Sequence, residues 1–258
     1  MRLYIKFFSM HMKSQMQYKV SFFLAAAGQF VVSFTTFLGV YFMFSRFHAV
    51  DGFTYAEALL CFASVLMAFS LGELFFSAFE VLPTMLGNGQ FDRALVRPRN
   101  IIFQVVALRT DFTRLGLLLQ ALLVLFHAIP NSGVVWTGDK VLTLFLMVFC
   151  GALVFSGLFV VYAAFTFFTV EGLEFMNILT YGGREHGRYP FSIYGDWVLK
   201  FLTYIIPLAL IQYYPLLYLL GRESGTIYML APLFSLLFLL PCYAFFRFGL
   251  RRYKSTGS

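Results

Sequence analysis

Residues 82–104 read LPTMLGNGQFDRALVRPRNIIFQ and form the longest polar break in the first half of a very apolar chain. Gly87-Asn88-Gly89 indicates a turn, because glycine and asparagine tolerate positive φ angles. Asn88 can cap a helix that follows, and Pro98 ends that helix, since the residue before a proline avoids the α region. The stretch therefore predicts a short helix held between two long apolar segments.

This predicted helix has two different faces. Phe91 and Leu95 lie four residues apart on one face, while Gln90, Arg93 and Arg97 form the opposite face. A short amphipathic helix that is basic on one side can be a handle gripped by a partner protein. It can equally be an ordinary positively charged cytoplasmic loop, and the residues alone leave both interpretations open.

The composition places the chain in the membrane class. Of its 258 residues, 60% are hydrophobic and only 12% are charged, which is far from the composition of a soluble domain. The apolar runs are long and unbroken, whereas a membrane β-barrel would show short alternating segments. We therefore predict an all-α polytopic membrane protein. The net charge of +7 comes from basic residues that lie at the ends of the apolar runs. These residues are spread along the chain and do not form a nucleic-acid-binding patch.

The apolar runs divide the chain into an N-terminal helix, six membrane spans and a basic tail. Residues 1–19 predict an amphipathic helix at the membrane interface, in preference to a cleavable signal peptide. The transmembrane region covers residues 20–248, includes the loop 80–104, and is followed by a tail at residues 249–258. The predicted spans are residues 20–44, 55–79, 101–129, 140–170, 197–220 and 227–248.

Six spans place both termini on the same side of the membrane. Assigning that side to the cytoplasm puts sixteen Lys and Arg residues there, including those of residues 171–200. The other side then holds three, Arg46, Lys140 and Arg222. This asymmetry follows the positive-inside rule and predicts that the loop 80–104 is cytoplasmic.

The sequence contains no motif for catalysis or metal binding. It has no Walker A sequence, so we do not expect it to hydrolyse ATP through a P-loop, and it has no His-Glu-x-x-His helix. The histidines and cysteines are scattered, without the spacing of a metal site or a disulfide: His11, His48, His127, His186, Cys61, Cys150 and Cys242. We expect no catalytic residue, no metal and no cofactor in this chain.

Several ionisable residues lie near the predicted cytoplasmic ends of spans. Burying them is costly unless they are paired, so acids and bases at the same depth predict ion pairs between helices. The alternative is a gate or relay at the cytoplasmic mouth. The acids lie near span ends, which argues against a proton-driven carrier. These residues are Glu73, Glu80, Arg109, Asp111, Arg114, Glu171 and Glu174.

Three stretches resemble the ABC-2 type transporter permeases. Residues 89–98, followed by Phe103-Gln104, are similar to the family's pattern G-x-L-D-x-x-L-x-R-P … F-Q. Residues 189–194 resemble its Y-P-x-x-I-Y segment, and residues 205–215 resemble its I-P-x-A … Y-P segment. Two positions depart from the pattern: Phe91 replaces leucine, and Arg99 stands where a small or polar residue is usual.

The resemblance implies a six-span subunit of a bacterial inner-membrane exporter. Such a subunit pairs with an identical or homologous second permease and docks two cytoplasmic ATPase subunits, which hold Mg-ATP. Phe91 and Leu95 would fill a groove on the ATPase, with charged residues making ion pairs around it. The implied ATPase-coupling residues are Gly89, Phe91, Asp92, Arg93, Leu95, Arg97 and Pro98.

Two other functions stay open. An ion-gradient-driven secondary transporter would move its substrate without ATP. An integral membrane enzyme or assembly factor would show an activity or a partner without transport.

Overall fold

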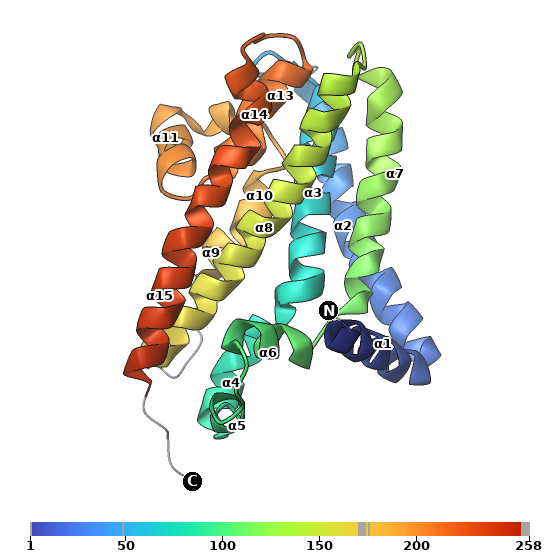
Figure 1. Cartoon of the computed structure of the whole chain (residues 1–258). Helices are drawn as coiled ribbons and strands as arrows, with labels where there is room; N and C mark the ends of the chain where they lie inside the picture. Colours follow the sequence, from blue (N-terminus) through green and yellow to red (C-terminus); the bar gives the residue numbers. More distant parts are fainter. Residues whose placement is uncertain (1, 48, 170–173, 175, 254–258) are drawn as a thin grey trace.

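The computed structural model describes residues 2–47, 49–169, 174 and 176–253, and its long helices run side by side in a bundle (Figure 1). Among the described residues, five helices are long and apolar enough to cross a membrane, or six if one bent pair counts as a span. The predicted all-α polytopic membrane fold is therefore confirmed. The principal long helices are α2 (Lys19–Phe47), α3 (Tyr55–Phe76), α7 (Leu115–Asn131), α8 (Gly138–Thr169), α14 (Thr226–Ser235) and α15 (Leu239–Arg252).

Short elements connect these helices. A two-stranded hairpin, β1 (Ala49–Val50) and β2 (Phe53–Thr54), joins α2 to α3. After α3 the chain continues through the 3-10 turn Ser77–Val81 into α4 (Leu82–Gly87). The remaining α-helices are α1 (Arg2–Gln17), α5 (Asp92–Leu95), α6 (Ile101–Leu108), α9 (Met176–Leu179), α10 (Tyr181–His186), α11 (Asp196–Tyr204), α12 (Leu208–Ile211) and α13 (Tyr213–Leu219).

Helices α3 and α8 form the centre of the bundle. A Cβ added at Gly72 of α3 would lie 3.0 Å from the carbonyl oxygen of Ala152 in α8. Small residues let helix backbones approach this closely in membranes. Phe69 fills the space beside this contact, with its ring centroid 5.3 Å from that of Phe155. Helix α3 is apolar all round, as expected of a buried helix, whereas α2 exposes most of its apolar side chains.

The N-terminal residues form a helix, α1, which lies across one end of the bundle beside α6 and the start of α7 (Figure 1). Its His11 ring lies 2.9 Å from the carbonyl oxygen of Ala107. Lys6 and Lys13 are exposed. The helix that we predict for residues 1–19 is therefore present at residues 2–17, and its position at a membrane interface stays a prediction.

The predicted span at residues 101–129 is present as two helices: a lead-in helix, α6, and the long helix α7, which begins next to Arg114. The helix is interrupted between α6 and α7, where Arg109 and Asp111 have extended backbones. Asp111 Oδ1 accepts a hydrogen bond from the Thr113 backbone N–H at 3.1 Å and so caps the next turn. Gln15 of α1 satisfies the freed backbone: its Nε2 donates to the Thr110 oxygen, and its Oε1 accepts from Phe112 N–H.

The predicted span at residues 197–220 is also not one helix. The chain bends by 86° between α11 and the α12–α13 segment. Pro207 lies at the bend and has no N–H to continue a helix. The helix is interrupted again at Gln212, between α12 and α13. The buried Nε2 of Gln212 donates a 2.7 Å hydrogen bond to the backbone oxygen of Tyr189. Broken helices are tolerated in membranes where such partners exist.

The close contact between α2 and α7 gives a test of the packing. A Cβ added at Gly116 of α7 would collide with the carbonyl oxygen of Ala26 in α2, whereas one added at Gly28 would meet nothing within 4 Å. We expect Gly116→Ala to lower the free energy of unfolding by about 1–3 kcal/mol through overpacking. Thermal unfolding of the purified protein in detergent measures this. Gly28→Ala is the matched control and should not lower stability; equal losses in both variants would contradict the contact.

Candidate functional site

The predicted coupling loop projects from the end of the bundle beyond the long helices (Figure 1). Helices α4, α5 and α6 follow one another there, with a turn at Gly89, whose φ is +65°. The turn that we predict from Gly87-Asn88-Gly89 is thus present. The predicted helix is shorter than expected: α5 is a single turn of four residues, Asp92–Leu95.

Phe91 is fully buried inside this chain. Its ring centroid lies 5.5 Å from that of Phe167 in α8 and 5.4 Å from that of Tyr253 after α15. The expectation that Phe91 and Leu95 together fill a groove on a partner is therefore wrong for Phe91. With only one helical turn, Phe91 precedes α5 and points into the core, whereas Leu95 is 40% exposed.

The other implied coupling residues divide into two groups. Asp92 is half-buried, and its Oδ1 accepts a hydrogen bond from the Tyr253 hydroxyl at 3.1 Å. The other group is exposed. It includes Val96, which is 86% exposed because it lies at the end of α5, and which the sequence pattern does not mark. The exposed residues of this segment are Arg93, Leu95, Val96, Arg97, Pro98 and Arg99, which we name the coupling surface.

Gln104 holds the coupling surface to α6. Its Nε2 donates to the Ala94 oxygen at 3.1 Å and to the Arg99 oxygen at 2.9 Å. These two bonds fix the loop between α5 and α6 at both of its ends. The Phe-Gln pair of the sequence pattern was the signal for this role, because a glutamine amide at a loop base can satisfy backbone carbonyls.

Among the described residues, one of the predicted ion pairs between helices is present, and Asp111 forms two further pairs with its near neighbours in sequence. Arg114 Nη2 lies 2.9 Å from Glu73 Oε1 and so joins α7 to α3. Asp111 pairs with both neighbouring arginines, at 3.4 Å from Arg114 and 3.5 Å from Arg109. Glu73 is completely buried, so this pairing supplies the partner that a charge at membrane depth requires.

Tyr181 of α10 links two of the predicted acidic residues, Glu73 and Glu80, through its hydroxyl group. Its hydroxyl oxygen lies 2.8 Å from Glu73 Oε1 and 2.6 Å from Glu80 Oε1. A phenol has one proton, so it donates to one carboxylate at a time. Tyr181 had no signal in the sequence. Glu174 is exposed, and Glu171 lies outside the described residues.

Residues 181–188, which the charge count assigns to the cytoplasm, pack against the middles of α3 and α8 through Gly183 and Gly187. A Cβ at Gly183 would lie 3.6 Å from the Phe155 ring, and one at Gly187 would lie 2.8 Å from Val65. Phe155 and Val65 are near the middles of α8 and α3. The two glycines, four residues apart, let α10 approach both helices. The side of the membrane that this segment faces stays a prediction, but the segment is packed against α3 and α8 and is no free loop.

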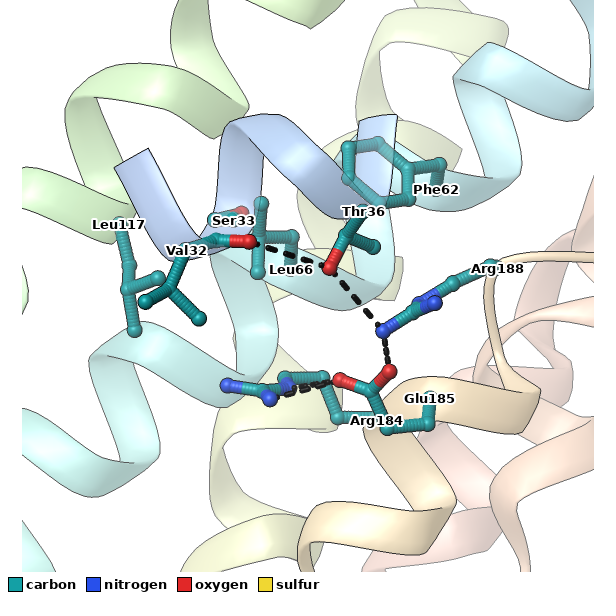
Figure 2. Close-up of a pocket in the computed structure, with 9 residues that line it drawn as sticks. All are labelled: Val32, Ser33, Thr36, Phe62, Leu66, Leu117, Arg184, Glu185 and Arg188. Carbon is teal, nitrogen blue, oxygen red and sulfur yellow. Dashed lines mark hydrogen bonds and ion pairs between the residues drawn. The ribbon is translucent and has the colours of Figure 1, made fainter. Parts of the chain in front are cut away.

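Two arginines and a glutamate enter the bundle with α10 (Figure 2). Arg184 donates to Glu185 Oε1 from Nε at 3.0 Å and from Nη2 at 2.6 Å. Arg188 pairs with the other carboxylate oxygen, and its Nη2 donates to Thr36 Oγ1 of α2 at 3.2 Å. These three charged residues, which we name the α10 cluster, line a cavity of about 10 Å³ together with residues of α2, α3 and α7.

Burial of Phe91 predicts that its role is structural. We expect Phe91→Ala to lower the free energy of unfolding by about 3–5 kcal/mol, as for other large aromatic side chains in cores. Thermal unfolding in detergent measures the loss. Leu95→Ala, in the same segment but 40% exposed, should leave the midpoint nearly unchanged; a comparable loss there would contradict the assignment of the two faces.

Comparison with known proteins gives the family. A family model described as ABC-2 family transporter protein matches residues 30–257. Comparisons with curated proteins and with solved structures found no match. The matched range includes the coupling surface, the α10 cluster and all the long apolar helices from α3 onward. The chain therefore belongs to the ABC-2 family of transporter proteins, as the three sequence motifs indicate.

Proposed function

We propose that this chain is the permease subunit of an ATP-driven exporter and that separate ATPase subunits drive it through the coupling surface. Membership of a transporter family and the apolar bundle support the role as a membrane passage. The observation that carries the coupling role is the projecting segment, which exposes Leu95 and Val96 beside three arginines. Apolar anchors within a charged rim are the usual make-up of a protein interface.

The residues packed behind the coupling surface can transmit a displacement of this surface to the long helices. Phe91 is packed against Phe167 of α8 and Tyr253, and Gln104 joins the segment to α6. Helix α4 continues directly from α3 through the 3-10 turn. A movement of α5 would therefore be passed to α3 and α8, which form the centre of the bundle, as rigid packed elements transmit small shifts.

The charge distribution supports placing the end with α4, α5 and α6 in the cytoplasm. Arg184, Arg188 and Lys200 can be left out of the cytoplasmic count, since residues 181–188 pack against α3 and α8 and Lys200 follows them in α11. Thirteen Lys and Arg residues then remain on that side against three assigned to the other. The bias still follows the positive-inside rule. Mg-ATP would be held by two ATPase subunits in that compartment, and a second permease, identical or homologous, would complete the passage.

We also propose that the Glu73 network takes part in gating at this end of the bundle. It connects α3, α7 and α10 through Arg114 and Tyr181. Glu80, in the turn between α3 and α4, shares the Tyr181 hydroxyl. A shift of α4 relative to α10 would change which carboxylate accepts the Tyr181 proton, so the network has two arrangements that a distant push can select.

The coupling proposal predicts the effect of charge on the coupling surface. Replacing both Leu95 and Val96 with Asp should abolish association with the ATPase subunit, with a loss of at least about 30-fold, because truncation of an interface anchor costs about 2 kcal/mol or more. The tagged chain is purified from its native membranes, and the ATPase subunit and its ATP hydrolysis are measured in the eluate.

Val135→Asp is the matched control. Val135 is 74% exposed at the opposite end of the bundle, between α7 and α8, so this variant should retain the ATPase subunit. Retention by the Leu95/Val96 variant as well would overturn the coupling role. Transport by the purified chain alone in vesicles, driven by an ion gradient without ATP, would replace the exporter with a secondary carrier.

A further inference from the structure

The α10 cluster has two arginines that share one glutamate within ion-pair distance. Two guanidinium groups, from Arg184 and Arg188, face a single carboxylate. In the described part of the chain, Glu185 is the only carboxylate within ion-pair distance of either arginine, and the nearby Glu73 is held by Arg114 at 2.9 Å. An unbalanced charge at this depth is costly, and such groups mark functional sites in membrane proteins.

Glu185 occupies the position of an oxyanion between the two arginines. Its Oε1 accepts two hydrogen bonds from Arg184, at 3.0 and 2.6 Å, and its Oε2 pairs with Arg188. This fork of planar donors is the arrangement with which guanidinium groups recognise phosphate as well as carboxylate. The Glu185 side chain is 36% exposed, against 19% and 22% for the two arginines. It therefore reaches the arginines from the more open side.

The cavity beside the cluster contains an unused polar group. Ser33 of α2 lines it and is 5% exposed, and its Oγ has no hydrogen-bond partner among the residues that the structure describes. Figure 2 shows Ser33 and Thr36 on the α2 wall opposite the α10 cluster. The cavity of about 10 Å³ has room for a single water molecule at most. An oxyanion can therefore bind only if the Glu185 carboxylate moves out.

The rest of the cavity wall is apolar. Val32, Phe62, Leu66 and Leu117 complete the lining. An anion that enters here is thus surrounded by hydrocarbon on the side away from the arginines. Once the Glu185 side chain has moved out, the space that it leaves borders both the two arginines and this apolar wall, so it suits a ligand with an oxyanion head and an apolar body.

We propose that Glu185 is a resident anion that an amphipathic phosphate displaces, so that Arg184 and Arg188 bind the phosphate of the ligand and Ser33 donates a further hydrogen bond. This assignment of a cargo class rests on the proposed transport function. Binding itself needs no ATPase subunit. No covalent bond forms or breaks; the exchange swaps one anion for another between the same two guanidinium groups.

The test measures binding of octyl phosphate, below its critical micelle concentration, to the full chain in a neutral detergent. Glu185→Gln removes the competing charge, so it should bind octyl phosphate roughly fivefold or more tightly than the wild-type chain. Arg188→Gln should abolish binding, while Arg188→Lys should retain part of it, because lysine keeps the charge without the planar fork. Isothermal titration gives the dissociation constants, and circular dichroism shows that each variant is folded.

The controls separate this site from general charge effects. Glu223→Gln and Arg251→Gln make the same changes at exposed positions outside the cavity and should leave affinity unchanged. Affinity that falls or stays constant in folded Glu185→Gln would overturn the proposal and make Glu185 a structural partner. Inorganic phosphate that binds as tightly as octyl phosphate would overturn the amphipathic assignment. Because the assay contains no ATPase, its outcome is independent of the association test above.

Discussion

The whole structure depends on one constraint: groups that cannot reach water inside a bilayer must find their partners within the protein. The bundle departs from continuous helices in several places, and side chains from distant segments repair these breaks. Gln15 of α1 bonds the free backbone before α7, and Gln212 bonds the chain that follows α10. These glutamines join elements far apart in sequence, so the breaks tie the bundle together.

The same constraint governs charge. Glu73 is buried completely and is stable there because Arg114 meets it at 2.9 Å. Arg184 and Arg188 are carried inward by a helix whose glycines allow close packing, and Glu185 neutralises part of their charge. Removing one member of such a group would leave the others buried and unpaired, which costs more than the pair itself contributes. Charged groups in this bundle therefore mark the places where its helices are held in register.

These connections give the proposed division of labour a physical basis. The coupling surface is small and exposed, yet the residues behind it belong to the same packed core as α8 and the end of α15. The Glu73 network lies between this surface and the α10 cluster, and Tyr181 of α10 contacts it directly. A push at one end of the bundle and an anion in its middle would thus act on the same helix, α10. That arrangement is what coupling of an energy source to a cargo site requires.

The sequence by itself determined the membrane class, the all-α fold, the family, the turn at Gly89 and the ion pairs of Glu73, Asp111 and Arg114. Hydropathy, turn residues and local motifs carry most of these features, because they depend on neighbours within a few residues. The pair of Glu73 with Arg114 joins distant residues, but the predicted spans place both at the same end of the bundle. Tertiary structure alone decided that Phe91 faces the core, that the chain is extended between α6 and α7, and that α10 packs against α3 and α8. Each of these depends on partners 75 or more residues away or on another helix, such as Phe167 for Phe91 and Gln15 for the break before α7. A local pattern cannot show which distant side chain will satisfy a buried group, and that satisfaction is what fixes the path of a chain through a membrane.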